Sequence, residues 1–358
     1  MSLSRRGFFA LAAATSLRAA SRSSKVEIGM DSYTLRGFGW DAFQYLDYAK
    51  KVGLDVIQFS EWPNLGSYDQ VRDDSYLKRV REHADKLGVR IEAGTWGVCP
   101  TNPGFGRSFA KYGTPAEQLR FALHWGGILG AKSIRCVMGS GNLRREDGPI
   151  EKHVEAMLKV LAEVRDDALR AGIKIAPENH KDLRATEMRA LIEEAGTDFV
   201  GCTLDTGNPM EVLEDPLETV EVLGPVAVAS HFRDSVLWEH PRGAAFQWTA
   251  LGDGTVGMEG AVKRFIEVAP GTPIMLEIIT GRPPAVLPYW ENDFWRAFPN
   301  LKAEEFLRFA KLVRKGGPLM AGMVIPNNAK DNPFYEKAVV EQQRVDFERS
   351  LAWLRGVL

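Results

Sequence analysis

The sequence has little cysteine and no strong excess of either charge. Its three cysteines, Cys99, Cys136 and Cys202, are too few and too widely spaced for a disulfide framework or a CxxC metal site. We therefore expect buried thiols. The formal net charge of -2 gives no broad basic field, and this argues against a nucleic-acid backbone or an anionic membrane as a partner.

Two other features are absent. No GxGxxG follows the first predicted strand, which argues against a doubly wound dinucleotide-binding sheet. No Ser/Gly/Pro-rich linker divides the middle of the chain. With 358 residues, 45% of them hydrophobic and 26% charged, the composition is ordinary for a globular enzyme. The length suits one α/β barrel of about 250 residues with extensions.

Residues 1–25 have the pattern of a targeting segment. Arg5 and Arg6 precede two phenylalanines and the short apolar run 10–17. This arrangement resembles a twin-arginine export signal, and the apolar run is too short to span a bilayer as a mature helix. We predict an exported protein, periplasmic or extracellular, with no stable membrane insertion once the signal is removed. A disordered basic N-terminus is the alternative.

Four short apolar runs end on a potential metal ligand. Each segment carries its ligand near its C-terminal end: Glu178 in 173–180, Asp205 in 200–208, His231 in 227–234 and Glu277 in 272–279. Each has the length of a buried strand, and a segment able to form a helix separates each from the next. Because parallel strands of an α/β barrel end at one mouth, we expect the four side chains to converge there.

The same alternation continues through most of the chain. Four more strands are predicted at 26–35, 55–62, 89–98 and 132–140, and helices at 43–53, 69–87, 115–129, 150–171, 185–195, 216–223 and 259–268. We predict a (β/α)8 TIM barrel over residues 26–315 with a C-terminal helical extension at 316–358. The Gly/Pro-rich loop at 100–113 is long enough to cover the barrel mouth.

Three segments near the C-terminal end have a less definite pattern. The Gly- and Trp-rich stretch after His231 is predicted to be irregular, and 301–314 to be the last barrel helix. Residues 335–358 predict an amphipathic helix, with Val345, Phe347, Leu351 and Leu354 on related faces. We expect it to pack on the outside of the barrel or against a second copy in a homo-oligomer.

Three carboxylates and one imidazole make a hard, oxygen-rich ligand set. Glu178, Asp205, His231 and Glu277 would suit Mn²⁺, Mg²⁺, Co²⁺ or Zn²⁺ with positions open to substrate, whereas a closed structural zinc would prefer thiolates. Each residue alone has a structural alternative, such as a helix-capping aspartate or a core histidine. Their repeated position at strand ends favours the metal interpretation.

Four short motifs carry a family resemblance. The segments ENH at 178–180, LDTGN at 204–208, SHFRD at 230–234 and LEI at 276–278 resemble the sugar phosphate isomerase/epimerase family of xylose isomerase-like barrels. The resemblance covers about residues 26–315. It implies one divalent ion bound by the four ligands, a small carbohydrate substrate, and Glu178 and Glu277 as an acid/base pair on opposite sides of the sugar.

The ligand set is suited to proton transfer. Removing a proton next to a carbonyl creates an enediolate, whose charge a divalent ion stabilises. Return of the proton to the neighbouring carbon gives an isomerase, and return to the other face gives an epimerase. We predict one of these activities. The alternatives are a metal-dependent lyase or hydrolase acting on oxidised glycosides or inositol-like substrates, or a non-catalytic carbohydrate-binding barrel.

Four further residues are predicted to bind substrate. His180 lies two residues beyond Glu178 and so on the same side of its strand, and Arg233 has the same relation to His231. Glu61 and Trp96 end earlier strands. For each of these four side chains a structural role, such as an ion pair, a helix cap or core packing, is the alternative.

Other positions limit the substrate. Ketose 3-epimerases of the superfamily have a histidine and an arginine where this chain has Asn208 and Leu237, which argues against free-ketose 3-epimerisation. The Gly252 and Gly254 turn is predicted to be a phosphate cradle or a plain turn. An abasic-site endonuclease of the superfamily would need more zinc-ligating histidines and a basic face.

Overall fold

The computed structural model describes residues 25–102, 113–319 and 333–358. All of the predicted export signal except Lys25, and most of the predicted 100–113 loop, lie outside the described residues, so both remain predictions. In the described part of the chain, no helix has the length and apolar character needed to cross a membrane.

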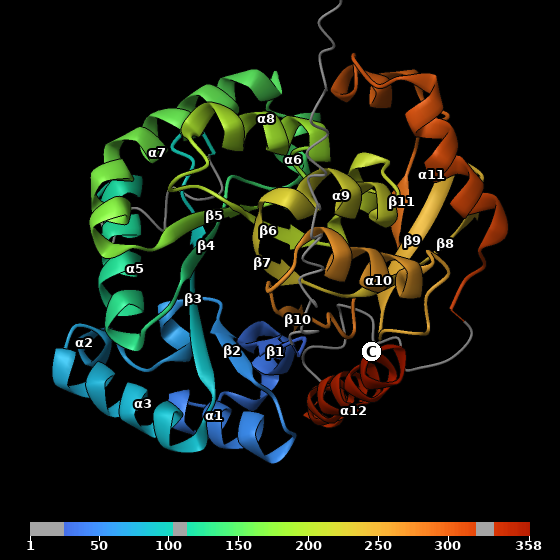
Figure 1. Cartoon of the computed structure of the whole chain (residues 1–358). Coiled ribbons are helices and arrows are strands. Elements are labelled where there is room, and N and C mark those ends of the chain that lie inside the picture. The colour runs from blue at the N-terminus through green and yellow to red at the C-terminus, as the bar shows by residue number, and fades with distance from the viewer. Residues whose placement is uncertain (1–24, 103–112, 320–332) are drawn as a thin grey trace, which may run out of the picture.

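Eight parallel strands form a nearly closed barrel, as predicted (Figure 1). In spatial order they are β10 (Ile274–Leu276), β1 (Ile28–Asp31), β2 (Val56–Phe59), β3 (Arg90–Gly97), β4 (Ser133–Val137), β5 (Lys174–Glu178), β6 (Cys202–Asp205) and β7 (Ala227–His231). Closure occurs just beyond β7, where Phe232 N donates to Met275 O at 2.7 Å and Glu277 N donates to Phe232 O at 3.2 Å. Two of the predicted metal ligands, His231 and Glu277, therefore lie beside the point where the ring closes.

Helices surround this barrel on its outer side (Figure 1). The long ones are α1 (Ala42–Lys51), α3 (Asp74–Leu87), α5 (Pro115–Leu129), α7 (Ile150–Ala171), α8 (Ala185–Ala195), α9 (Pro216–Leu223) and α10 (Met258–Val268). The shorter ones are η1 (Ser32–Phe38), η2 (Trp62–Asn64), α2 (Tyr68–Val71), α6 (Gly141–Arg145), η4 (Asn208–Val212), η5 (Gly224–Val226) and η6 (Asn292–Ala297).

Strong end signals explain why several helices match their predicted limits. At the start of α5 the Thr114 side chain accepts from Glu117 N, and Pro115 occupies the first helical position. The same helix ends at Gly130, and α7 ends at Gly172, both with positive φ angles of 78° and 66°. These caps fix the ends independently of the tertiary fold.

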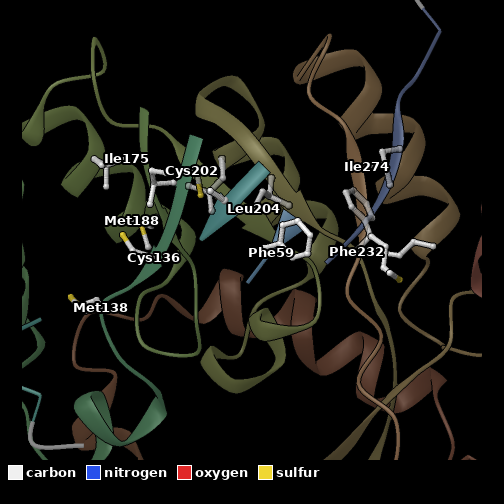
Figure 2. Close-up of a cluster of buried hydrophobic side chains, with 14 of the residues drawn as sticks. Phe59, Cys136, Met138, Ile175, Met188, Cys202, Leu204, Phe232 and Ile274 are labelled. Carbon is white, nitrogen blue, oxygen red and sulfur yellow. The ribbon is translucent and has the colours of Figure 1, made fainter. Parts of the chain in front are cut away.

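Along β4, β5 and β6, successive side chains point alternately towards the surrounding helices and into the barrel. Cys136, Ile175, Cys202 and Leu204 lie on the side of β4, β5 and β6 that packs against the helices, near Met188 of α8 (Figure 2). The residues between them include polar side chains that meet inside the barrel, as the hydrogen bonds below establish. Cys99, Cys136 and Cys202 are buried and unbridged, which confirms the prediction of core thiols.

Residues 234–249 form a hairpin, so the prediction of an irregular segment after His231 was wrong for this part, whereas residues 250–257 are irregular as predicted. Strands β8 (Asp234–His240) and β9 (Gly243–Thr249) pair antiparallel, and β11 (Ala285–Leu287) completes a three-stranded sheet in the order β11-β9-β8. Most hairpin residues are buried on both faces. The sequence therefore lacks the polar and apolar alternation that marks a half-exposed strand.

The C-terminal helices differ from their predicted arrangement. Helix α11 (Ala303–Lys315), predicted to be the last barrel helix, packs on β8 instead. Helix α12 (Pro333–Val357) contacts η1, β10 and α10, and Tyr48 Oη of α1 donates to Glu348 Oε1 at 3.1 Å (Figure 1). Packing of the terminal helix on the barrel's outside is thus confirmed.

The buried face of α12 is narrower than the sequence predicted. Phe347 and Leu354 have no exposed surface and Leu351 is 3% exposed, whereas Val345 is 38% exposed. The four residues therefore do not form one buried face. Because η1 and α1 meet only one side of the helix, Val345 faces solvent.

Candidate functional site

The four predicted ligands come together at the mouth of the barrel. One ligand atom from each of Glu178, Asp205, His231 and Glu277 lies within 4.8 Å of the others. The first three side chains have no exposed surface, and Glu277 is 6% exposed. Their strands differ in sequence position but end on the same side of the sheet, which is why residues about 100 positions apart meet.

Hydrogen bonding fixes the orientation of the histidine. His231 Nε2 lies 2.6 Å from Gln58 Oε1, an oxygen that can only accept, so this bond assigns the proton to Nε2. Nδ1 is buried and has no hydrogen-bond partner, and it lies 3.4 Å from Glu178 Oε2 and 3.5 Å from Glu277 Oε2. In the neutral ring Nδ1 would then carry no proton, and a nitrogen lone pair that faces two carboxylates fits a divalent metal ion.

The backbone after β6 fixes the aspartate in a similar way. Asp205 Oδ1 accepts from Gly207 N at 2.6 Å and from Asn208 N at 2.8 Å. Asn179 pairs with the Asp205 backbone, donating to its carbonyl at 2.9 Å and accepting from its N–H at 2.8 Å. These bonds leave Asp205 Oδ2 directed at the cluster, where Arg233 Nη2 donates to it at 2.6 Å.

Two buried arginines compensate the clustered carboxylates. Arg135 of β4 donates from Nε to Glu178 Oε2 at 2.6 Å, and Arg233 bridges Asp205 and Glu277. Asn208 Nδ2 donates to Glu178 Oε1 at 2.9 Å. Without such partners, three neighbouring carboxylates in a dry interior would be strongly destabilising.

The pKa shifts follow from burial and these charges. Burial raises the pKa of Glu178, but Arg135 and His231 outweigh it and hold that pKa well below its usual range. Burial raises the pKa of Asp205 to about 7, although Arg233 opposes the shift. Burial lowers the pKa of His231, but Glu277 and the other carboxylates raise it well above its usual value. A divalent cation would instead favour ionised carboxylates and neutral imidazole.

A cavity of about 370 Å³ lies beside the cluster. All four residues predicted to bind substrate line it, namely Glu61, Trp96, His180 and Arg233, and so does Glu277. Glu178 does not line the cavity, but its carboxylate is bonded to Arg135, which does. The volume is in the range of small-molecule sites.

Burial shifts the pKa values of two lining residues, His180 and Glu61, in opposite directions. His180 Nδ1 lies 2.6 Å from the carbonyl of Gly139 and therefore carries the proton, and burial lowers the pKa of His180 to about 4. The ring meets Trp96 edge-on, with centroids 5.3 Å apart. Glu61 stands at the start of η2 but makes no side-chain capping bond, and burial raises its pKa while Arg135 opposes the shift.

Sequence reasoning missed several residues of the site. Gln58 and Arg135 were signalled only as polar residues inside the apolar runs VIQF and SIRCV. Trp248 and Arg282 also line the cavity, but their segments were not predicted to reach it. Lys181 lines it with a φ angle of 68°, a backbone conformation that the sequence does not reveal.

The glycine-rich turn is a plain turn. Gly252 N and Gly254 N donate to Asp234 Oδ2 at 3.1 and 3.2 Å, so the protein's own carboxylate occupies the position of an anion. Of the two predicted alternatives, the structure therefore supports the plain turn and not the phosphate cradle. Leu237, at the position of the epimerase arginine, is buried in β8.

Comparison with known families identifies the fold. The family model described as xylose isomerase-like TIM barrel matches residues 46–311. This range is more than half of the chain, and the structure has the eight parallel strands of such a barrel. The protein belongs to the xylose isomerase-like TIM barrel family.

Curated relatives are distant and partial. The chain is 22% identical over 190 residues to 3-oxo-isoapionate decarboxylase of Pectobacterium atrosepticum, covering 53% of this chain and 59% of that protein. It is 20% identical over 170 residues to the uncharacterized protein YihM of Escherichia coli, covering 45% and 52%. The chain thus spans only between half and three-fifths of the length of these relatives.

Solved structures support the same fold. D-psicose 3-epimerase of Clostridium cellulolyticum H10, solved with D-tagatose, has a TM-score of 0.53 at 13% identity, covering 92% of this chain and 99% of that chain. A xylose isomerase-like barrel of Mycobacterium smegmatis in complex with magnesium also scores 0.53 at 13% identity, covering 81% and 98%. The IOLI protein with a bound zinc atom scores 0.54 at 14%, covering 80% and 96%.

Proposed function

We propose that the protein is a divalent-metal-dependent isomerase or epimerase of a sugar or sugar derivative. One observation carries the proposal: His231 Nδ1 has no hydrogen-bond partner and faces the carboxylates of Glu178 and Glu277 beside a cavity. With Asp205, these residues would hold Mn²⁺, Mg²⁺, Co²⁺ or Zn²⁺. Two observations on similar barrels support the proposal. One barrel was solved with magnesium and another with zinc, and a third is named as an epimerase.

The proposed chemistry is proton transfer at a carbon next to a carbonyl. When bound, a divalent ion would polarise that carbonyl and stabilise the enediolate charge. Glu277 lines the cavity, held by Arg233, and takes or returns the proton on that side. Glu178 is the second member of the pair, oriented by Arg135 and Asn208.

The cavity wall positions the substrate in this proposal. Because His180 commits Nδ1–H to Gly139, its Nε2 is an acceptor for a sugar hydroxyl. Trp96 offers an apolar ring to the face of the sugar, and Glu61 and Arg233 offer polar contacts. Asn208 is bonded to Glu178, which argues against the histidine-dependent free-ketose 3-epimerisation.

A lyase is the second candidate. Glu61 is a carboxyl group in the same cavity whose pKa is raised by burial, so it can donate a proton to a departing β-substituent. The decarboxylase named among the relatives also breaks a carbon bond. A non-catalytic carbohydrate-binding barrel would need neither this acid nor the opposed Glu178 and Glu277.

Metal dependence tests the proposal. The protein is stripped with a chelator, its metal content is measured, and each of the four ions is added back separately. Turnover of a panel of sugars, ketoses and 3-oxo-glycosides is followed by product analysis. Activity should be lost on stripping and restored by at least one ion. Activity that survives complete metal removal contradicts both the isomerase and the lyase proposals.

Export by residues 1–25 is a separate proposal. It is supported by the twin arginines before an apolar run. Replacing Arg5 and Arg6 together by lysine should retain the protein in the cytoplasm, as measured by cell fractionation. Unchanged fractionation of this variant would contradict a twin-arginine route.

A further inference from the structure

The cavity has more positive than negative side chains in its wall. Four cations line it, and two of them are already paired, Arg135 with Glu178 and Arg233 with Asp205 and Glu277. The remaining two are Lys181, which follows β5, and Arg282, which follows β10. Among the described residues, neither forms an ion pair with a carboxylate of the metal-ligand cluster.

The Lys181 ammonium is held in place without a close counter-charge. Its nearest carboxylate oxygen, Glu211 Oε1, is 3.9 Å away, and Glu211 also pairs with Arg145 at 3.0 Å. Nζ lies 4.5 Å from the centroid of the Trp248 ring, which donates from Nε1 to Gly207 O at 2.9 Å. The side chain is only 20% exposed, so water compensates its charge incompletely.

The backbone at Lys181 is also unusual. Its φ angle of 68° lies in the left-handed region, which is costly for a lysine and which asparagine or glycine adopts more easily. Such conformations persist only where the surrounding structure holds them, and they cluster at functional sites. Here the conformation accompanies a lysine placed in the cavity wall.

Arg282 provides the second charge. Its side chain is exposed at the cavity, and it makes no ion pair with a carboxylate in the described ranges. Its carbonyl accepts from Gln247 Nε2 of β9 at 3.1 Å, which ties this segment to the hairpin that carries Trp248. Burial lowers the pKa of the Lys181 ammonium, and the charges of Arg233 and Arg282 lower it further, whereas Glu211 opposes the shift.

We infer that Lys181 and Arg282 form an anion subsite in the cavity wall, so that the substrate is a sugar derivative with a carboxylate or phosphate group away from its reacting carbon. This inference rests on the proposed function for the identity of the sugar. Two like charges facing one cavity repel each other until an anion binds between them.

Pairs of an anionic ligand and its neutral counterpart test the subsite. Isothermal titration calorimetry of the Mg²⁺-loaded protein compares D-gluconate with D-gluconamide, and D-sorbitol 6-phosphate with D-sorbitol. We expect at least one anion to bind about tenfold more tightly than its neutral partner. The advantage should disappear in Lys181→Asn and Arg282→Gln, and it should persist in Lys86→Asn, which removes an exposed lysine from α3.

The outcomes are distinct. An advantage for gluconate identifies a carboxylate site, and one for sorbitol 6-phosphate a phosphate site. Equal binding within both pairs, no measurable binding of either anion, or an advantage that survives both Lys181→Asn and Arg282→Gln overturns the subsite. Lys181→Asn is expected to fold, because asparagine tolerates the left-handed conformation.

The assay also separates the subsite from the proposed function, because it measures binding and not turnover. A charge-dependent advantage in a protein that turns over no sugar would overturn the isomerase proposal and support the subsite. Turnover of neutral sugars without any such advantage would overturn the subsite and support the isomerase proposal.

Discussion

Glu178 and Glu277 contact the same histidine but differ in access to the cavity. Replacing either by glutamine keeps the side-chain shape and removes the proton acceptor. We predict a loss of turnover of about 10³-fold or more in each variant, with the fold retained. Steady-state kinetics, circular dichroism and metal content would be measured together. Glu194→Gln, on the exposed face of α8, is the matched control. Wild-type turnover in Glu178→Gln or Glu277→Gln would refute the assigned pair.

Gln58 holds His231 in the form that can bind metal. Gln58→Leu removes the acceptor for Nε2–H, and the imidazole can then rotate or change tautomer. We predict a fall of about 10- to 100-fold in Mn²⁺ affinity, measured by titration of the stripped protein. Gln58→Glu retains an acceptor and should stay closer to wild type. Equal affinity in all three proteins would mean that Gln58 does not orient the ligand.

His180 should make the protein sensitive to mild acid. Burial lowers its pKa from 6.5 to about 4, so between these values the unfolded chain binds a proton that the folded chain does not. Its contribution to stability is therefore complete above pH 6.5 and is lost as the pH falls towards 4. At about 1.4 kcal/mol per pKa unit, the loss is up to about 3 kcal/mol.

Urea denaturation of the stripped protein from pH 7 to pH 4 measures this effect. His180→Asn keeps a donor for the Gly139 carbonyl but does not titrate. The variant should lose less stability over this range than wild type. Parallel pH profiles for the two proteins would exclude the assignment.

Site residues were predictable where each of them occupies the same place, the C-terminal end of a predicted strand. Glu178, Asp205, His231 and Glu277 each end a strand, and parallel topology converts that shared position into proximity. Arg135 and Gln58 were not identified because facing into the barrel depends on strand register. Lys181 could not be identified, because its φ angle results from the tertiary structure.

Elements with local end signals were predicted well, and those defined by tertiary packing were not. Thr114 and Gly130 delimit α5 in the sequence itself. The hairpin β8–β9 has no such signal because both of its faces are buried. Its misassignment hid the route by which Trp248 reaches the cavity.

Helix α12 should contribute strongly to stability, because its buried face covers η1 and α1. Phe347 has no exposed surface and its ring lies 6.1 Å from that of Tyr48. We predict that Phe347→Ala lowers the free energy of unfolding by about 3–5 kcal/mol. Val345→Ala, at a 38% exposed position of the same helix, should change it by less than about 0.5 kcal/mol.

Chemical denaturation followed by circular dichroism measures both variants. If Phe347→Ala and Val345→Ala have equally small effects, the helix is not docked on the barrel in solution. The wild-type protein under the same conditions gives the reference.

At the scale of the whole molecule, the barrel was predictable because eight strand and helix units alternate along the chain. The position of α12 beside η1, β10 and α10 was not predictable, because the sequence does not show which of the two C-terminal helices packs there and which packs on β8. The resulting molecule combines a buried Glu, Asp and His cluster with a cavity whose wall includes cations from β4, β5 and β10 or the loops that follow them.

The central claim is metal-assisted proton transfer next to a carbonyl. Its most direct test is proton NMR of a substrate panel in D₂O with the Mg²⁺-loaded protein. The account predicts that deuterium enters at a carbon next to the carbonyl of at least one sugar, ketose or 3-oxo-glycoside. It also predicts that Glu277→Gln and chelation abolish this exchange. Conversion of a substrate without any deuterium incorporation, or exchange that persists in the stripped protein, would contradict it.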